Sequence, residues 1–552
     1  MKDKNTLNWL LARAKGQLWQ IVMLAVFRCS LTILGVTFAL TSRYVIDAAV
    51  AKDISMLTSS AIRLFIIIAA QIGIKLLGQS IEVSVTARLN INLRSHLFSS
   101  ILKSDYSAQA AYHSGDLLTR LSNDTSIISS GIISLVPSVL ALCVGLVYAL
   151  YSLMRLDMSF AVILLVGGII LLITISAFRN IMKKLHKRVQ ETEGIVRSFW
   201  QESLGSILMI KVFGIESNIN QKNNKLQQDN FKAQMKRRGL SIVASSSLGF
   251  IFSIGSFYAL VHSAYRLFLG TITFGTLTAI IQLVNQIQAP FAGLSGVLPN
   301  YYAILASAER IIEVESLPEE VNLSAQLDAK KAYQDLDRIR FSDISFGYGR
   351  DIVLENANLT IEKGDFAVIG GISGIGKSTL IKLLLGVLNP QNGKIYLDTQ
   401  NGEVPVGKHS RPLFSYVPQG NLLLSGTIRE AVSMVCENAT DEDIMKAAEI
   451  SCADGFISKL PDGLDTYIGE KGAGLSEGQI QRLAVTRAIL SDAPVILLDE
   501  ATSALDEETE RKLLENIRSL ENKTCVIISH KRAAFDICNK HIYIEDKKIT
   551  VK

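Results

Sequence analysis

The sequence predicts an α-helical membrane domain followed by an α/β domain. Of the 552 residues, 49% are hydrophobic and only 19% are charged, an apolar excess that an ordinary soluble enzyme does not carry. Most of this excess lies before about residue 310, and strand-like runs alternating with helical patterns fill the chain after about residue 338. The composition excludes a disordered chain, and the net charge of +5 gives no reason to expect a nucleic-acid partner.

Six long apolar stretches predict six membrane-spanning helices. A spanning helix needs about 20 mostly apolar residues. The stretches that meet this need are Leu18–Leu40, Leu64–Leu77 with its flanks, Ile132–Leu153, Phe160–Phe178, Ile242–Phe268 and Phe274–Leu305. One such stretch fits a buried helix of a soluble protein, but six in succession do not. We therefore predict a multi-pass membrane domain over residues 1–315.

The loop charges predict the orientation of these helices. Lys and Arg are concentrated in Arg179–Arg238, whereas the hairpins Leu153–Ser159 and Gly270–Phe274 are short and carry little charge. An excess of Lys and Arg marks the cytoplasmic side of a membrane. We expect the long loops, both chain ends and the C-terminal domain to be cytoplasmic, in a protein of the plasma membrane.

The two long loops are predicted to be helical. Thr86–Lys103 and Met182–Met209 keep apolar residues at helical spacing and contain almost no Gly or Pro, so the membrane helices extend into the cytoplasm. Near the loop tips, Ser114–Arg120 and Gly205–Phe213 are predicted to form short transverse helices. A polar linker over residues 316–337 then leads into a parallel α/β domain over residues 338–552.

The strongest motif is a glycine-rich loop of the form G-x-x-x-x-G-K-[ST]. It consists of Gly371, Ile372, Ser373, Gly374, Ile375, Gly376, Lys377 and Ser378, with Thr379 following. The strand-like run Phe366–Ile369 precedes it and the apolar helix Leu380–Leu385 follows, which is the context that the motif requires. Such a loop wraps phosphates with backbone N–H groups, its Lys reaches the outer phosphates, and its Ser hydroxyl ligates Mg²⁺. ATP and Mg²⁺ are the predicted cofactors.

A second motif is the apolar strand Val495–Leu498, which ends in Asp499 and Glu500. Asp499 is placed to hold the hydration shell of Mg²⁺, and Glu500 to orient or deprotonate an attacking water. Taken alone, an Asp-Glu pair is equally well explained as the start of a helix. The glycine-rich loop upstream favours the catalytic interpretation.

Four further positions are less specific by pattern. Leu475–Gln479 precedes the helix Ile480–Leu490, with Ser476 as its N-cap, so it fits either an anion site or an ordinary capped helix. Tyr348 is placed either to stack on a purine or to pack on its own domain. Gln419 follows Pro418 in a turn, and His530 follows the last apolar strand. Spacing alone assigns neither of them a role.

These motifs, in this order, resemble an ABC transporter half of the exporter type, over nearly the whole chain. The resemblance implies a bundle of six transmembrane helices followed by a P-loop NTPase domain of the ABC class. Ser503–Asp506 is similar to the D-loop of that family, and Thr466–Glu470 to its X-loop. The two predicted transverse helices resemble its coupling helices.

The resemblance also implies roles for single residues. Tyr348 is expected to stack on adenine, Gln419 to sense Mg²⁺ and the membrane domain, and His530 to contact the γ-phosphate. Glu470 is expected to touch the coupling helices. The sequence departs from the family pattern at Glu477, where Gly is commonest, and in the residues Lys531–Ala534 that follow His530.

The resemblance implies a dimer, because one half-transporter does not complete an ATP site. Ser476, Gly478 and Gln479 are expected to bind the γ-phosphate of ATP held by the opposite subunit, and Asp506 to bridge the subunits. The intact motif residues favour a homodimer, with a heterodimer as the alternative.

The expected function is ATP-driven export of an amphipathic solute, peptide, drug or lipid by alternating access in the dimer. An importer and an ATP-gated channel on the same fold are the alternatives. Several polar residues fall inside the predicted spans: Arg28, Gln71, Lys75, Gln282, Asn285, Gln286 and Gln288. Such residues either line a solute cavity or form hydrogen bonds between helices, and the sequence leaves both open.

Overall fold

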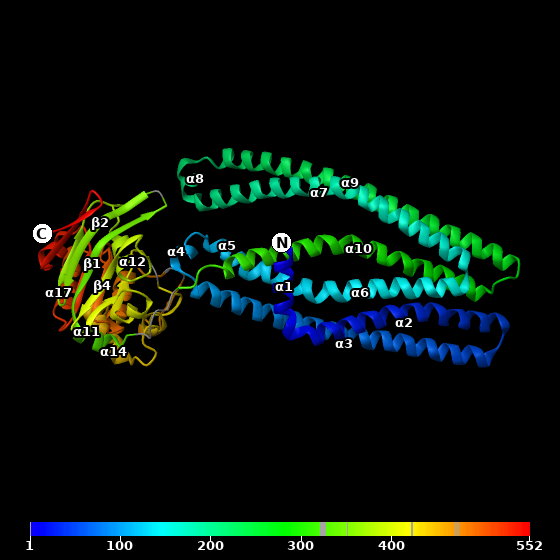
Figure 1. The fold of residues 1–552 in the computed structure, drawn as a ribbon, viewed down its shortest axis with the longest axis horizontal. Coiled ribbons are helices and arrows are strands. Elements are labelled where there is room, and N and C mark those ends of the chain that lie inside the picture. Colours follow the sequence, from blue (N-terminus) through cyan, green and yellow to red (C-terminus); the bar gives the residue numbers. More distant parts are fainter. Residues whose placement is uncertain (1, 321–326, 350, 421–422, 470–471, 473) are drawn as a thin grey trace. The chain divides into compact units, whose positions relative to one another are not determined.

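The computed structural model describes residues 2–552 apart from 321–326, 350, 421–422, 470–471 and 473. It divides into two compact units, one of residues 1–99 with 114–315 and the other of residues 100–113 with 316–552. The first unit is helical, and every described strand lies in the second (Figure 1).

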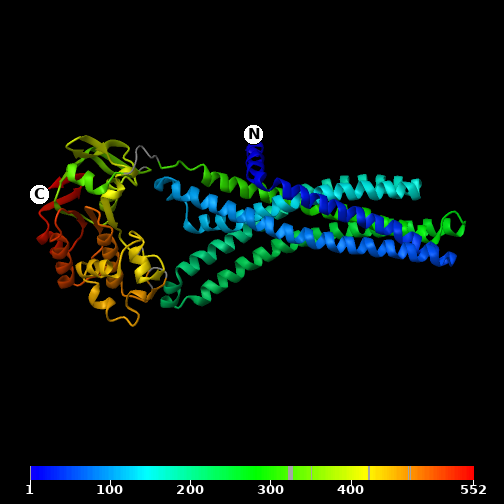
Figure 2. The same cartoon turned by 90° about the horizontal axis from the view of Figure 1, so that it is seen from below.

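The first unit is built from long helices joined by short connections. Its helices are α1 (Lys2–Ala14), α2 (Leu18–Ala51), α3 (Ile54–Lys103), α5 (Ser114–Thr119), α6 (Thr125–Leu156), α7 (Met158–Gly205), α8 (Ile207–Phe213), α9 (Glu216–Phe268) and α10 (Phe274–Glu315). A 3-10 turn at Lys15–Gln17 joins α1 to α2, and a π-helical segment at Arg120–Asp124 joins α5 to α6. Figures 1 and 2 show α7 and α9 running side by side along their length.

The longest helices exceed the thickness of a bilayer. α3 has 50 residues and α9 has 53, which at 1.5 Å per residue is about 75–80 Å, against about 30 Å of hydrocarbon core. The helical interpretation of the long loops is therefore confirmed for Thr86–Lys103. For Met182–Met209 the structure adds a break at Ser206, where α7 ends and α8 begins.

Four helical segments in the described part of the chain are long and apolar enough to cross a membrane: Asn5–Ala51, Ile54–Lys103, Ser114–Leu156 and Glu216–Phe268. The predicted spans Phe160–Phe178 and Phe274–Leu305 fall in α7 and α10. The side chains of 159–180 and 289–296 lie outside the described residues. Six spans are compatible with this fold, and their number stays a prediction.

Short helices occur at both predicted tips. α5 and α8 lie at the positions predicted for the transverse helices, and one more short helix, α4 (Tyr106–Gln109), precedes α5. Asp105 caps α4 by accepting hydrogen bonds from two backbone N–H groups. The segment 100–113 that carries α4 belongs to the second unit, where the Asp105 backbone N–H donates to Pro318 O at 2.8 Å.

The second unit combines three sheets. Its strands are β1 (Leu336–Tyr348), β2 (Asp351–Glu362), β3 (Phe366–Gly370), β4 (Asn392–Thr399), β5 (Gly402–Pro405), β6 (Phe414–Val417), β7 (Gly426–Thr427), β8 (Tyr467–Ile468), β9 (Val495–Asp499), β10 (Thr524–Ile528), β11 (Lys540–Glu545) and β12 (Lys548–Val551). The order β12-β11-β3-β10-β9-β6 makes a sheet that is parallel from β11 to β6, which confirms the predicted parallel α/β architecture. The same unit also contains a separate four-stranded antiparallel sheet, β2-β1-β4-β5, which was not predicted.

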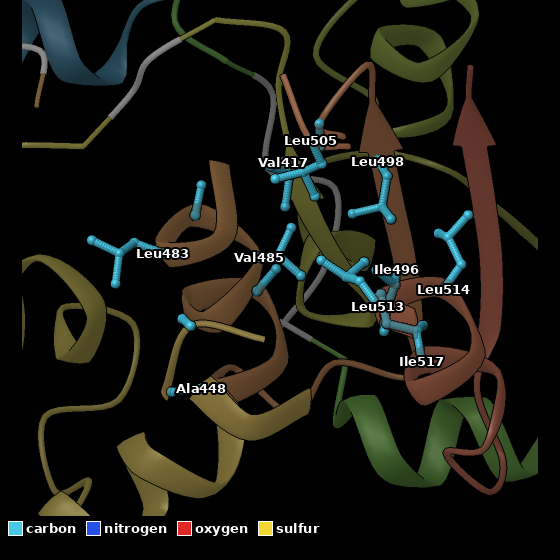
Figure 3. Packing of buried hydrophobic residues seen from close by; sticks show 14 of the residues in the cluster. Val417, Ala448, Leu483, Val485, Ile496, Leu498, Leu505, Leu513, Leu514 and Ile517 are labelled. Atoms are coloured by element: carbon cyan, nitrogen blue, oxygen red, sulfur yellow. The ribbon is translucent and has the colours of Figure 1, made fainter. Parts of the chain in front are cut away.

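Helices cover the parallel sheet and bury its apolar strands. They are α11 (Ala329–Asp335), α12 (Lys377–Leu384), α13 (Ile428–Ser433), α14 (Asp441–Ile450), α15 (Asp454–Ile457), α16 (Glu477–Leu490), α17 (Glu507–Arg518) and α18 (Arg532–Ile537). Every residue of β3, β9 and β10 is buried. Figure 3 shows Leu483 and Val485 of α16 in the same apolar cluster as Ile496 and Leu498 of β9 and Leu513 of α17. This core fixes the strand ends at which the motif residues lie.

Candidate functional site

The glycine-rich loop connects β3 to α12 and leaves open space over its centre. Gly371, Gly374 and Gly376 have φ values of +140°, +82° and +112°, which glycine adopts without strain. A Cβ on Gly376 would lie 2.3 Å from Val353 Cγ1, whereas a Cβ on Gly374 would meet nothing within 4 Å. The loop therefore packs closely on one side and keeps room for a ligand at its centre, before the N-terminus of α12, which attracts anions.

Lys377 is buried and folded back over this loop. Its ammonium donates to Gly371 O at 2.9 Å and to Ile372 O at 3.0 Å, and lies 3.0 Å from His530 Nε2. Burial lowers the pKa of Lys377, and the carboxylates of Glu500 and Asp499 partly oppose that shift. A phosphate would give this ammonium a stronger partner than the loop carbonyls do.

Asp499 ends β9 and is joined to the loop by a hydrogen bond. Its carboxylate accepts from Ser378 Oγ at 3.0 Å and from the Tyr416 hydroxyl at 3.2 Å. Burial raises the pKa of Asp499, although both hydrogen bonds act in the opposite direction.

This pair of oxygen donors fits Mg²⁺, which takes one or two protein oxygens and completes its shell with phosphate and water. No cluster of three His, Cys, Asp or Glu side chains able to hold a metal occurs within the described residues. A metal ion at Ser378 and Asp499 would therefore depend on a bound nucleotide for further ligands.

The ends of three parallel strands meet at Glu500, which itself follows β9. Its carboxylate accepts from Gln419 Nε2 at 2.6 Å, after β6, and lies 3.7 Å from His530 Nε2, after β10. The Glu500 backbone has φ +50° and is held by its N–H donating to Ile528 O at 3.1 Å. Left-handed backbone at a non-glycine residue is strained and is found mostly where function requires it. The carboxyl ends of parallel strands are also where α/β folds bind ligands.

Tyr348 combines the two interpretations that the sequence left open. Its ring meets Phe346 edge-on, with ring centroids 5.1 Å apart and planes at 89°. The hydroxyl lies 3.5 Å from Thr379 Oγ1, which places the ring next to the glycine-rich loop. The side chain is nevertheless 51% exposed. Tyr348 thus packs on its own domain and still offers surface to a base.

Within the described residues, the structure does not join the segment Leu475–Gln479 to the glycine-rich loop. Ser476 caps α16 in a reciprocal box, in which its Oγ accepts from the Gln479 N–H and its own N–H donates to Gln479 Oε1. Gly478 lies against the D-loop, since a Cβ there would be 3.1 Å from Ala504 O. Across the described part of the chain, no hydrogen bond joins Ser476, Gly478 or Gln479 to residues 371–379.

Asp506 caps a helix as well. Its carboxylate accepts from the Thr509 N–H at 2.9 Å at the start of α17, and that hydrogen bond lowers the pKa of Asp506. The role expected for Glu470 lies outside the described residues.

Sequence reasoning missed two residues at this site. Tyr416 donates to Asp499, and the Lys531 ammonium donates to Leu505 O in the D-loop. Tyr416 lies in β6, three residues before Gln419. This closeness in sequence to a predicted site residue could have indicated that Tyr416 is near the site. Lys531 was noticed only as a departure from the family pattern.

The fold and the site define a membrane protein whose helices are fused to an ATP-hydrolysing P-loop domain. The chain belongs to the ABC transporter family. The family model described as "ABC transporter transmembrane region" matches residues 21–291, and the one described as "ABC transporter" matches residues 354–503. The two matches together take in about three quarters of the chain.

Curated relatives and a solved structure agree with this assignment. An ATP-dependent lipid A-core flippase of Syntrophus aciditrophicus is 27% identical over 80% of this chain and 74% of its own length. A Staphylococcus aureus protein with a provisional name as a multidrug export ATP-binding/permease protein is 27% identical over 88% of this chain and 85% of its own. A bacterial Atm1-family ABC exporter with ATP bound has the same fold, with a TM-score of 0.78, 22% identity, and coverage of 98% of this chain and 94% of that one. The chain is an ABC transporter half of the exporter type and an ATP-hydrolysing multi-pass membrane protein.

Proposed function

We propose that two copies of this chain export an amphipathic solute, such as a lipid, a drug or a peptide, across the plasma membrane. The names of the relatives, a lipid A-core flippase and a multidrug export protein, support a solute of this class. The Lys and Arg residues of 179–238 support a cytoplasmic position for the P-loop domain.

The observation that carries the proposal is the cluster of motif side chains at the carboxyl ends of β3, β6, β9 and β10. Lys377 contacts His530, Ser378 contacts Asp499, and Gln419 contacts Glu500, all at distances of 2.6–3.0 Å. These residues come from distant parts of the sequence and carry the charges that phosphoryl transfer needs.

Each side chain has a chemical task in this proposal. ATP with Mg²⁺ supplies the phosphoanhydride bond whose hydrolysis releases the free energy for transport. Glu500 orients the attacking water and accepts its proton, since its carboxylate stands at the strand end with Gln419 and His530 beside it. Lys377 and His530 would stabilise charge on the outer phosphate, and Ser378, Asp499 and Gln419 would hold the metal ion.

The second copy is needed because one chain separates the two halves of the site. Ser476, Gly478 and Gln479 make no hydrogen bond to the described glycine-rich loop of their own chain. We infer that they face the loop of the partner, with Asp506 at the subunit boundary. A homodimer is favoured because Lys377 and the acidic pair Asp499 and Glu500 are all present in this chain.

The polar residues in the spans divide into two groups. Three of the glutamines form hydrogen bonds between helices: Gln282 Oε1 accepts from Ser42 Oγ, Gln286 Nε2 donates to Gly35 O, and Gln288 Nε2 donates to Phe252 O. Arg28 pairs with Glu82 at 2.7 Å. Asn285 is exposed in the chain. We assign contact with the solute to exposed residues such as Asn285, and bundle packing to the three glutamines.

The test is Glu500→Gln in the full chain reconstituted in lipid. A general base contributes about 10²–10⁴-fold, so hydrolysis should fall by at least about 100-fold while ATP binding persists. The matched control is Glu521→Gln, an exposed acid after α17, which should leave hydrolysis unchanged. Near-normal turnover in the Glu500 variant would remove this residue from its role.

Transport itself separates export from the two alternatives. In inside-out vesicles an exporter accumulates a labelled lipid or dye in the lumen when ATP is added. An importer would deplete the lumen, and a channel would conduct without consuming ATP in proportion to flux.

A further inference from the structure

The residue after His530 makes an unusual set of contacts. Lys531 lies between β10 and α18, and its ammonium donates to Thr502 O at 2.8 Å and to Leu505 O at 2.5 Å. The same ammonium lies 3.5 Å from Glu510 Oε2. A lysine ammonium has three N–H donors, of which two donate to these carbonyls while its charge pairs with Glu510. One side chain therefore binds the backbone at Thr502, just before the D-loop (Ser503–Asp506), and at Leu505 within it.

Burial makes this arrangement hard to replace. Glu510 is fully buried, and its Oε1 accepts from Thr502 Oγ1 at 2.6 Å. Its Oε2 has no hydrogen-bond partner within the described residues and faces Lys531. A buried carboxylate without a cation is strongly unfavourable, so Lys531 neutralises Glu510 while it binds the two carbonyls.

The D-loop is also held from the side of α16. Gln481 Nε2 donates to Ser503 Oγ at 2.9 Å, and Gln481 Oε1 accepts from the Ala504 N–H at 3.0 Å. Gly478 leaves room for this approach, since a Cβ there would lie 3.3 Å from Leu505 Cδ2. The segment is thus fixed between the helix that carries Ser476 and the ammonium of Lys531.

The neighbour of Lys531 reaches the opposite side of the site. His530 Nε2 lies 3.0 Å from Lys377 Nζ and 3.7 Å from Glu500 Oε1. Two consecutive residues therefore contact the phosphate-binding lysine and the D-loop. Any backbone shift that follows a change at His530 also moves the attachment point of the D-loop.

We propose that Lys531 is a positioning residue that sets the D-loop conformation according to the state of His530. Its ammonium transmits to Thr502–Leu505 whether His530 is engaged at the outer phosphate. This inference rests on the proposed function, because the D-loop acts there at the boundary between two copies.

The test compares Lys531→Met, Lys531→Arg and the double variant Lys531→Met/Glu510→Gln in the full chain in lipid. The double variant removes the buried charge together with its partner, so it separates positioning from neutralisation. We expect Lys531→Met and the double variant to lower kcat for ATP by about tenfold with KM within about threefold, since nucleotide binding does not use Lys531. Lys531→Arg should restore at least half of the rate.

The matched control is Lys540→Met. Lys540 is a partly buried lysine that pairs with Asp365 at 2.7 Å in the same unit. Its removal should leave the rate within about twofold, because it contacts no motif residue.

The outcomes separate this inference from the proposed function. If the double variant hydrolyses ATP at the wild-type rate, Lys531 only neutralises Glu510 and the inference is wrong. If Lys531→Arg is as slow as Lys531→Met although both fold, the geometry is not the cause and the inference is wrong as well. Loss of hydrolysis in Glu500→Gln with a normal rate in the double variant leaves the proposed function intact. A normal rate in Glu500→Gln contradicts the proposed function itself.

Discussion

Single side chains at the site are held in states that a stable fold would avoid. Burial raises the pKa of Asp499 and lowers the pKa of Lys377, so both charged forms are disfavoured before a ligand arrives. Glu500 adds a left-handed backbone with φ +50°. Functional sites often retain such features at the expense of stability. A nucleotide and its metal ion would give the charged forms of Asp499 and Lys377 the partners that they lack.

Asp499→Asn is therefore expected to raise the stability of the nucleotide-free protein while it abolishes hydrolysis. The pKa of Asp499 is higher in the folded than in the unfolded state. Its contribution to the free energy of unfolding therefore falls as pH rises from the unfolded pKa, about 4, through the folded one. At pH 7 the variant should melt a few degrees above the wild type, and the difference should vanish below about pH 4. Thermal unfolding across pH measures this.

Asp398→Asn provides a control of opposite sign. Hydrogen bonds from Arg340 and Arg338 lower the pKa of Asp398, so its ionised form contributes stability above the unfolded pKa. That contribution is lost as pH falls through the folded pKa. Asp398→Asn should therefore melt below the wild type at pH 7. A lower melting point for both variants would contradict the account of Asp499.

The motif residues could be predicted because their spacing is local, whereas their partners could not. Gly371–Ser378 and Val495–Glu500 are each read within a few residues of chain. The hydrogen bond between Tyr416 and Asp499 joins positions 83 apart, and that between Lys531 and Thr502 joins positions 29 apart. Such contacts depend on the strand order, which the periodicity of each strand does not contain.

Among the elements, α16 serves both stability and the proposed site. Ser476 caps it by a box that Thr440 repeats at α14, where Thr440 Oγ1 accepts from the Asp443 N–H and Asp443 accepts from the Thr440 N–H. Removing either cap should cost about 1 kcal/mol of stability. Because Ser476 also faces the partner's phosphate in our proposal, Ser476→Ala should lower hydrolysis strongly and Thr440→Ala should not. Equal rates in the two variants would leave Ser476 with a capping role alone.

The helix α10 carries, at neighbouring positions, a residue that packs the bundle and a residue to which we assign contact with the solute. Gln286 donates to Gly35 O at 2.8 Å, and interhelical hydrogen bonds in membranes contribute about 0.6 kcal/mol on average. Gln286→Leu should lower thermal stability slightly and keep the pattern of stimulation of ATP hydrolysis by different drugs and lipids. Asn285→Leu should change that pattern with little effect on stability. The reverse result would move the solute contact to the glutamines.

Elements differ in how well the sequence predicts them. The long helices and the strands β3, β9 and β10 follow from sustained apolar patterns. The three strands are found within a few residues of the expected bounds, whereas the helices run beyond their apolar stretches, as α9 does by starting at Glu216 and not at Ile242. The antiparallel sheet β2-β1-β4-β5 was not predicted, because β1 and β2 alternate in burial and their pairing shifts register near Phe341 and Ile344. The placement of residues 100–113 with the second unit depends on contacts with residues over 200 positions away, such as that between Asp105 and Pro318.

Considered as a whole, the molecule carries one copy of each half of the composite site that we propose. The glycine-rich loop and the cap of α16 share a domain, yet in the described part of the chain no hydrogen bond joins them. Symmetric pairing of two chains would complete two sites at once, since a two-fold axis brings each half to its complement. ATP affinity would then depend on association, and association on ATP.

Mixing two inactive variants tests this directly. Lys377→Ala damages the loop half and Ser476→Arg the capping half, so each homodimer has two broken sites. A mixed dimer has one site with both defects and one site with none. Random pairing should thus restore hydrolysis to at most about a quarter of the wild-type rate if the sites act independently. The matched control mixes Lys377→Ala with Glu500→Gln, whose defects lie in the same half and leave no intact site in any dimer. Recovery in the first mixture alone supports composite sites. Equal rates in both mixtures would contradict composite sites, because both halves of each site would then belong to the same chain.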